Sequence, residues 1–365
     1  MSNKAMSNSA IATALLLTLG LTVSAAEPPT ASITNGTVRA KLHLPDAENG
    51  YYRGTRFDWS GSVLSLEAGG HSYFGQWFAR YDPKIHDSIT GPVEDYAPLH
   101  YNEAKPGETF VKIGVGVLRR AEDQAYRFST AYDLLDTGKW SVRTGADFVE
   151  FRHEVADPKS GYGYVYTKTV RLTSGKPQMT IEHNLRNTGT KAIETNVYNH
   201  GFFMLDAQTT GPDFTVTFPF EIKASRPMTG LAEIKGKQIV YLKELEENAN
   251  AAAPPAAPAP AAVPATAPGA APGRGPGRGG RQQASTLVEG FSTDAKDFDF
   301  RIENRKTGAG IRVTGDHPLS RLNFWTVRTT VCPEAYVDVK AAPGKDTSWR
   351  LTYDFYSLPK EAGAR

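Results

Sequence analysis

The sequence lacks the features that mark several large classes of protein. Its 365 residues contain a single cysteine, Cys332, so no disulfide can form within the chain. Lysine and arginine number 41 against 39 aspartates and glutamates, and this near balance argues against a general binder of polyanions such as nucleic acid. After the N-terminus, no apolar run reaches the length of a membrane span, about 20 residues. We therefore expect no nucleic-acid partner, and no membrane partner once the N-terminus has been removed.

The N-terminus itself resembles a secretory signal. Lys4 provides a weakly basic start, residues 11–23 are mostly apolar, and Ser24-Ala25-Ala26 offers small side chains at a cleavage site. Residues 1–26 are accordingly predicted to be a signal peptide, with an uncleaved anchor as the alternative. The mature protein is expected to be periplasmic or secreted.

Helical periodicity is also scarce, and only residues 241–248 suggest a short helix. Strand-like alternation of apolar and polar residues dominates instead, and turn residues separate the runs. Many strands with such punctuation predict an all-β fold, a large antiparallel β-sandwich or a barrel, formed as one domain by residues 27–365. The alternating sets include Val111, Ile113, Val115 and Val117; Met179, Ile181, His183 and Leu185; and Trp349, Leu351, Tyr353 and Phe355.

One segment interrupts this pattern. Residues 248–281 consist almost entirely of Ala, Pro and Gly, with several arginines near the end. Such a composition has little to bury and predicts a disordered insertion at about residues 248–284. It could link two domains, but the piece that follows is too small for a confident core of its own. We therefore interpret it as a surface loop within one domain, which the slow growth of loop-closure entropy permits.

A histidine and a glutamate stand out as candidates for acid–base chemistry. His200 ends an apolar run in Asn199-His200-Gly201-Phe202-Phe203, and Glu334 follows Cys332-Pro333 in a similar position at the end of a strand. An imidazole and a carboxylate brought together from distant strands can act as general acid and general base.

The same motifs resemble those of the aldose 1-epimerases, or galactose mutarotases. The resemblance covers most of the chain after about residue 147 and omits the Ala/Pro/Gly-rich segment. It implies a mutarotase-type β-sandwich, a sugar substrate, His200 as general acid, Glu334 as general base, and no metal or cofactor. The matching segments are residues 163–172, 179–189 and 198–203, then Cys332-Pro333-Glu334, Ala342-Pro343-Gly344 and residues 349–355.

The N-terminal half departs from that family. The strings Gly-Arg-x-x-Asn-Arg and Leu-His-Gly-Gly are absent. Aromatic, arginine and carboxylate side chains suited to binding sugars are dense there instead. We expect Arg56, His86, Glu94 and Asn199 to contact the substrate, with Arg53 as an alternative to Arg56. Two other functions stay open: a carbohydrate-binding protein without catalysis, and a polysaccharide lyase or hydrolase.

Overall fold

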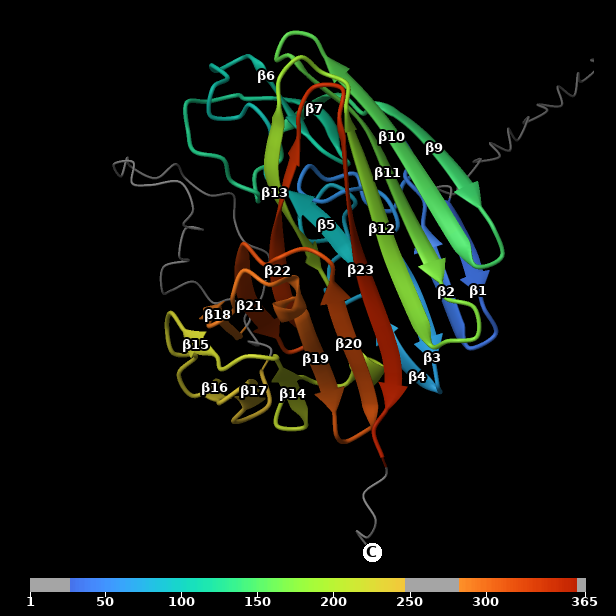
Figure 1. The fold of residues 1–365 in the computed structure, drawn as a ribbon, viewed down its shortest axis with the longest axis vertical. Helices are drawn as coiled ribbons and strands as arrows, with labels where there is room; N and C mark the ends of the chain where they lie inside the picture. The colour runs from blue at the N-terminus through green and yellow to red at the C-terminus, as the bar shows by residue number, and fades with distance from the viewer. Residues whose placement is uncertain (1–26, 247–281, 360–365) are drawn as a thin grey trace, which may run out of the picture.

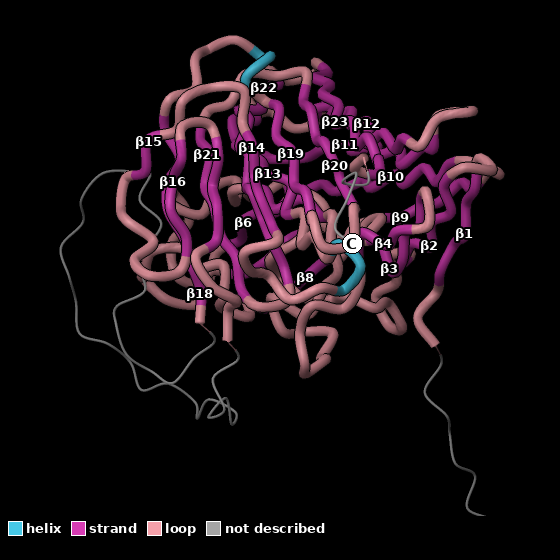
Figure 2. Tube along the Cα trace, turned by 90° about the horizontal axis from the view of Figure 1, so that it is seen from below, coloured by secondary structure: helices cyan, strands magenta, loops and turns pink. Residues whose placement is uncertain are grey.

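The structure is a computed structural model that describes residues 27–246 and 282–359. The expected signal peptide and nearly all of the expected insertion lie outside the described residues. Within them the chain forms strands throughout, and helix is confined to two short 3-10 turns, η1 (Leu205–Ala207) and η2 (Ala295–Asp297) (Figure 2). No helix in the described ranges is long and apolar enough to cross a membrane.

The strands form two large and two small sheets, and every pairing between them is antiparallel (Figure 1). The ten-stranded sheet has the order β16 (Ala232–Lys235), β17 (Gln238–Tyr241), β14 (Phe214–Thr217), β19 (Asp299–Asn304), β20 (Ala309–Gly315), β23 (Asp346–Ser357), β12 (Gln178–Asn187), β11 (Tyr162–Leu172), β10 (Phe148–Asp157) and β9 (Lys139–Thr144).

The six-stranded sheet carries the candidate site described below. Its order is β15 (Lys223–Ala224), β18 (Gln283–Glu289), β21 (Arg321–Val327), β22 (Thr330–Ala341), β13 (Ile193–His200) and β5 (Val93–Tyr96). A four-stranded sheet contains β1 (Thr30–Thr34), β2 (Val38–His43), β3 (Val63–Ala68) and β4 (His71–Phe74). A three-stranded sheet contains β6 (Thr109–Lys112), β7 (Gly116–Arg119) and β8 (Asp133–Asp136).

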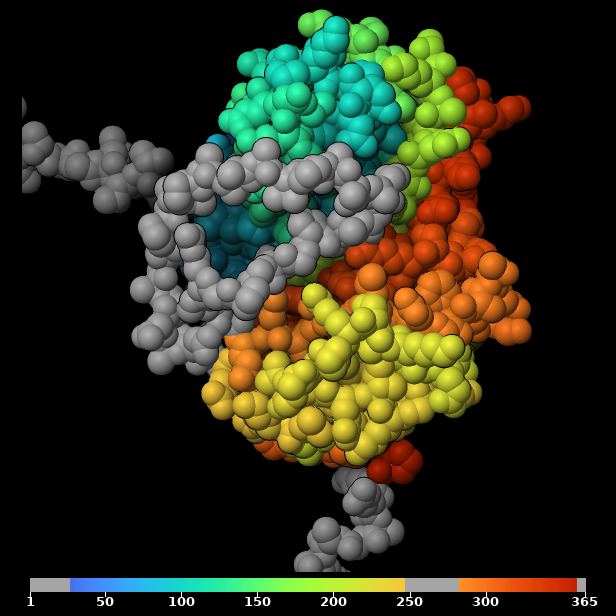
Figure 3. All heavy atoms as spheres, turned by 90° about the vertical axis from the view of Figure 1, so that its left-hand side faces the viewer, coloured from blue at the N-terminus to red at the C-terminus, as the bar shows by residue number. Residues whose placement is uncertain are grey.

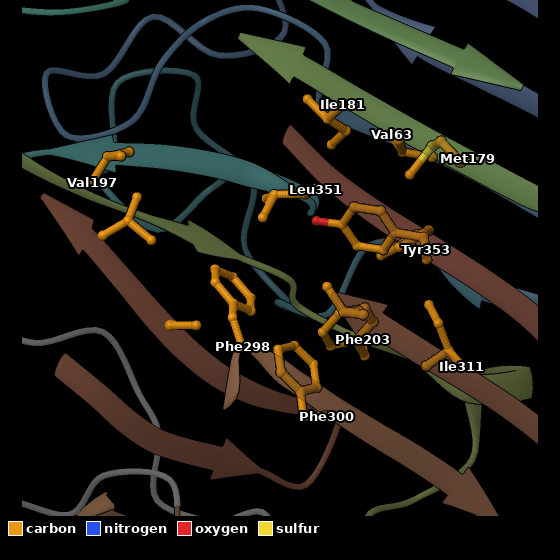
Figure 4. Packing of buried hydrophobic residues seen from close by; sticks show 14 of the residues in the cluster. Val63, Met179, Ile181, Val197, Phe203, Phe298, Phe300, Ile311, Leu351 and Tyr353 are labelled. Atoms are coloured by element: carbon orange, nitrogen blue, oxygen red, sulfur yellow. The ribbon is translucent and has the colours of Figure 1, made fainter. Parts of the chain in front are cut away.

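A shared hydrophobic core joins the two large sheets. Phe203, Phe300 and Leu351 are among its members, and Figure 4 shows their side chains packed together between ribbons of both sheets. The alternation predicted for β12 is confirmed, since Ile181 and His183 are buried while Glu182 between them is exposed. Burial of a large apolar side chain stabilises the fold by roughly 1.5–3 kcal/mol. The face of the strand that carries these side chains therefore packs into the core, and the other face meets solvent. The all-β sandwich predicted from the sequence is confirmed.

The structure differs from the sequence-based predictions at three places. The alternating residues 111–117 are not one strand, because the chain turns at Gly114 (φ 77°) and returns as β7. Residues 242–246 are not helical. Strand β18 begins at Gln283, inside the range expected for the insertion, because it pairs with β21. Figure 3 shows the face on which the β6–β8 region (teal and green) lies above the β14–β18 region (yellow and orange).

Candidate functional site

The two residues expected to perform acid–base chemistry lie next to each other. Strands β13 and β22 pair with Tyr198 opposite Tyr336, and continuing that register by two residues brings His200 to Glu334. Nε2 of His200 lies 3.3 Å from Oε1 of Glu334. Both residues are buried, at 3% and 6% exposure. The structure therefore brings together on one face of the six-stranded sheet two residues that are distant in the sequence.

Aromatic rings enclose His200. The ring of Phe202 stacks on its imidazole with 3.7 Å between centroids, and Phe57 and Trp325 each present an edge at 5.7 Å. Burial, and then the nearby charge of Arg56, hold the pKa of His200 well below its usual value. Its Nδ1 atom has no hydrogen-bond partner among the described residues. The imidazole is therefore neutral at physiological pH.

Glu334 has the opposite tendency, because burial favours its protonated form. Burial raises the pKa of Glu334 to about 7, although a hydrogen bond from Asn323 and the charges of Arg56 and Arg321 offset part of the effect. Nδ2 of Asn323 donates to Oε2 of Glu334 at 2.7 Å. A carboxyl group that titrates near neutral pH can both accept and release a proton under working conditions.

Arg56 lies beside this pair, and each nitrogen of its guanidinium group has a partner. Its Nε donates to Oδ2 of Asp95 at 3.0 Å, one terminal nitrogen donates to the Tyr198 hydroxyl at 2.7 Å, and the other contacts Asp87. Asp95 also accepts a hydrogen bond from Nζ of Lys112 at 2.7 Å. This charged cluster forms one wall of the candidate site, and a ligand could hydrogen-bond to Arg56 only by sharing the guanidinium with these partners.

His86 reaches the same wall indirectly. Its Nε2 lies 3.2 Å from Oδ2 of Asp87, which in turn contacts Arg56, and its side chain is 28% exposed. Phe128 packs against both, with its ring 5.8 Å from the His86 ring and 4.1 Å from the guanidinium of Arg56. Arg53 instead donates to the backbone of Glu48 at 2.6 Å. Of the two candidate arginines, it is therefore Arg56 that lies at the site.

The structure does not bring Glu94 and Asn199 to this face. Successive side chains of a strand point to opposite sides, so Glu94 points away from Asp95, and Asn199 away from His200. Oε1 of Glu94 accepts a hydrogen bond from Asn199 at 2.9 Å, and Oδ1 of Asn199 accepts one from Tyr353 of the ten-stranded sheet at 2.7 Å. Both residues thus point toward the ten-stranded sheet and not to the face of His200 and Glu334; Glu94 is buried there, and Asn199 is part-buried.

Sequence reasoning missed several residues of the site. Asp95, Tyr198 and Asn323 all point to the face of His200 and Glu334. Strand alternation could have found two of them, because Tyr198 shares the parity of His200, and Asp95 directly follows Glu94. The contribution of Asn323 depends on the pairing of β21 with β22, which local pattern does not reveal.

A cavity of about 460 Å³ lies elsewhere, lined by turns of the four-stranded sheet and by His71 and Asp206. Nδ1 of His71 lies 2.9 Å from Oδ2 of Asp206 there. In the described parts of the chain, no group of three or more His, Cys, Asp or Glu residues is arranged to hold a metal ion. We locate the candidate site at His200 and Glu334, because titratable groups with shifted pKa values converge there.

Comparison with solved structures identifies proteins of similar fold. A galactose mutarotase related enzyme from Lactobacillus acidophilus superposes with a TM-score of 0.52 at 10% identity, covering 92% of this chain and 100% of that one. The GalM/aldose epimerase homologue from C. elegans gives 0.50 at 12% identity, covering 91% and 100%. The Slr1438 protein of Synechocystis sp. PCC 6803 gives 0.51 at 13%, covering 93% and 100%.

The chain has the galactose mutarotase-like fold. This agrees with the resemblance seen in the sequence after residue 147, and it extends the likeness to the N-terminal half. No protein-family model matches the sequence, and no curated protein matches it either. The likeness is therefore one of fold, and the chemistry must be argued from the residues of the site.

Proposed function

We propose that the protein is an aldose 1-epimerase-like enzyme, which interconverts the anomers of a sugar by opening and closing its ring. The observation that carries the proposal is the buried contact between His200 and Glu334, 3.3 Å apart on a mutarotase-like scaffold. Ring opening needs one proton acceptor and one proton donor near two oxygens that share a carbon atom. A pair at this separation can reach both oxygens.

The pKa values of the pair supply the required proton. Burial holds the pKa of His200 well below its usual value and raises that of Glu334 to about 7. Between these two values the pair holds one proton, located mainly on Glu334. A shift of that proton to the imidazole produces the arrangement implied by the family resemblance, with a carboxylate base and an imidazolium acid. The two arrangements have the same total charge and titrate as one coupled system.

The reaction then balances without any further reagent. The acceptor takes the proton of the anomeric hydroxyl, whose oxygen forms a carbonyl with C1. The bond between C1 and the ring oxygen breaks, and that oxygen takes the proton of the donor. Rotation about C1–C2 and closure in reverse give the other anomer, with each member of the pair in the other role. Each positioned proton transfer contributes about 10²–10⁴-fold in rate.

The surroundings support a sugar as the substrate. The half-buried ring of Trp325 lies at the edge of His200, and aromatic faces pack well against the apolar faces of sugar rings. The aromatic enclosure also excludes water, which strengthens electrostatic interactions inside the site. The signal-like N-terminus favours a reaction outside the cytoplasm.

Magnetisation exchange between the α and β anomers of several free aldoses, followed by NMR, tests the proposal. We expect the protein to accelerate exchange for at least one sugar, and His200→Asn and Glu334→Gln each to lower the rate by about 10²–10⁴-fold. The matched controls are His317→Asn and Glu182→Gln, which alter a partly exposed histidine and an exposed strand glutamate. Buffer-level exchange for every sugar, with binding retained, would establish a carbohydrate-binding protein instead.

A further inference from the structure

A closed ionic cluster lies directly behind the site, in the interior between the two large sheets. Lys168 of β11 contacts both Glu94 and Asp58, the latter at 3.3 Å, and its Nζ donates to the backbone oxygen of Ser60 at 2.6 Å. Glu94 also accepts the hydrogen bond from Asn199. The side chains of Lys168, Asp58 and Glu94 are at most 1% exposed, so the proposed reaction cannot use them directly.

The partners of Lys168 are the immediate neighbours of site residues in the chain. Glu94 precedes Asp95, which binds Arg56. Asp58 lies two residues after Arg56, and its backbone N–H donates to the backbone oxygen of Glu94 at 2.9 Å. Asn199 likewise precedes His200. The cluster therefore contacts three segments on their interior side, and neighbouring residues of the same segments form the candidate site on the other side.

Stability alone does not explain such a cluster. Removing three charges from water costs several kcal/mol for each ion, and well-packed neutral side chains of similar volume are often as stable or more so. Burial alone would lower the pKa of Lys168, but Asp58 and Glu94 together raise it, so the ammonium stays charged. His183 also faces Glu94, at 3.5 Å, and burial lowers its pKa to about 4, so it adds no competing charge at neutral pH.

We propose that Lys168 is a positioning residue for the His200–Glu334 pair. From the opposite sheet, its ammonium ties Glu94 of β5 to Asp58 of the Arg56–Asp58 segment. Those two anchors hold the wall that contains Arg56 and, through Asn199, the end of β13 that presents His200. The inference rests on the proposed function for its kinetic consequence, but not for its structural one.

The test removes the tie without leaving a buried charge unpaired. Lys168→Met alone leaves two buried carboxylates without a cation and can prevent folding. The decisive variant therefore combines it with Asp58→Asn and Glu94→Gln. The amides keep the neighbouring hydrogen bonds, but no ammonium joins them. The matched control is Arg312→Met with Asp299→Asn, which removes an ion pair with contacts of 2.7 and 2.9 Å between β19 and β20. Thermal unfolding confirms that both variants are folded.

Two readouts separate positioning from a merely structural role. The first is the titration of the His200 ring by NMR of histidine-labelled protein, assigned with His200→Asn. We expect the triple variant to move the His200 pKa upward, toward its ordinary value, as Arg56 and His200 lose their fixed placement. The second is anomer exchange, where we expect kcat to fall by up to about 100-fold with little change in KM, as for a displacement of about 1 Å.

The outcomes are distinct. A folded triple variant whose His200 titration and kcat both match those of the Arg312/Asp299 control would overturn the positioning role. If the wild-type protein exchanges no anomers at all, the proposed function fails while the His200 titration still decides whether Lys168 positions the site. An upward His200 shift in the triple variant, absent from the control, supports the inference in either case.

Discussion

Replacing Glu334 by glutamine should make the protein more stable at alkaline pH while removing its activity. The pKa of Glu334 is raised from 4.5 to about 7, chiefly by burial. Each pKa unit corresponds to about 1.4 kcal/mol, so ionising the buried side chain costs about 3 kcal/mol in the folded state. Glutamine has nearly the same shape, still accepts the hydrogen bond from Asn323, and never ionises.

The pH dependence of this stability difference follows from the upward shift of the Glu334 pKa. The folded-state pKa exceeds the unfolded one, so the neutral side chain retains its full stability below about pH 4.5, and that stability is lost as the pH rises through about 7. The free energy of unfolding of the wild type should be lower than that of the glutamine variant by about 1 kcal/mol at pH 5 and by about 3 kcal/mol at pH 8. Other titrating groups are common to both proteins and cancel in the difference.

Urea unfolding of both proteins at pH 5, 6, 7 and 8 measures this difference directly. Glu182→Gln, on the exposed side of β12, serves as the control and should show no comparable trend. A stability difference between wild type and Glu334→Gln that stays constant across this range, or that favours the wild type at pH 8, would refute the assignment of a neutral, buried Glu334.

Three further expectations follow from the same geometry. Anomer exchange should be fastest below about pH 7 and decline as the pH rises through it, because the acid–base pair then loses its only proton; a kcat/KM that rises through pH 7 would contradict a singly protonated pair. Asn323→Ala removes the hydrogen bond that favours ionised Glu334, so that decline should move upward by about 1 pH unit, and an unchanged midpoint would argue against this contact. Arg56→Met leaves Asp87 with only His86 and Asp95 with only Lys112 as basic partners. It should lower the free energy of unfolding in urea at pH 7 by about 3–5 kcal/mol, and a loss below about 1 kcal/mol would indicate an exposed cluster.

Much of the fold could be predicted from local pattern. In β12 and β23 the side chains alternate between a dry core and an exposed surface, so periodicity alone reveals strands and their inward faces. The turn at Gly114 is not predictable in this way, because the apolar residues on either side keep the alternation across it and the positive φ of the glycine leaves no mark in the pattern. The signal peptide and the extent of the Ala/Pro/Gly-rich insertion stay predictions.

The candidate site was only half accessible to such reasoning. His200 and Glu334 carry recognisable motifs, and the structure places them in contact. Asn199 is adjacent to His200 in the sequence, and Glu94 is adjacent to Asp95, yet both point to the other side of their strands. Successive side chains of a strand point to opposite faces, so the residue next to a site residue in the sequence points away from the site.

The strand-rich architecture, the balance of charge and the two residues suited to acid–base chemistry can be inferred without a structure, because these depend on residue type and local alternation. The adjacency of β13 and β22, the ion pairs of Arg56, and the contacts of Lys168 with Glu94 and Asp58 could be seen only in the folded molecule. Pairing between distant strands and depth of burial set these properties. The pKa shifts of His200 and Glu334 are caused chiefly by that burial, so they exist only in the folded chain.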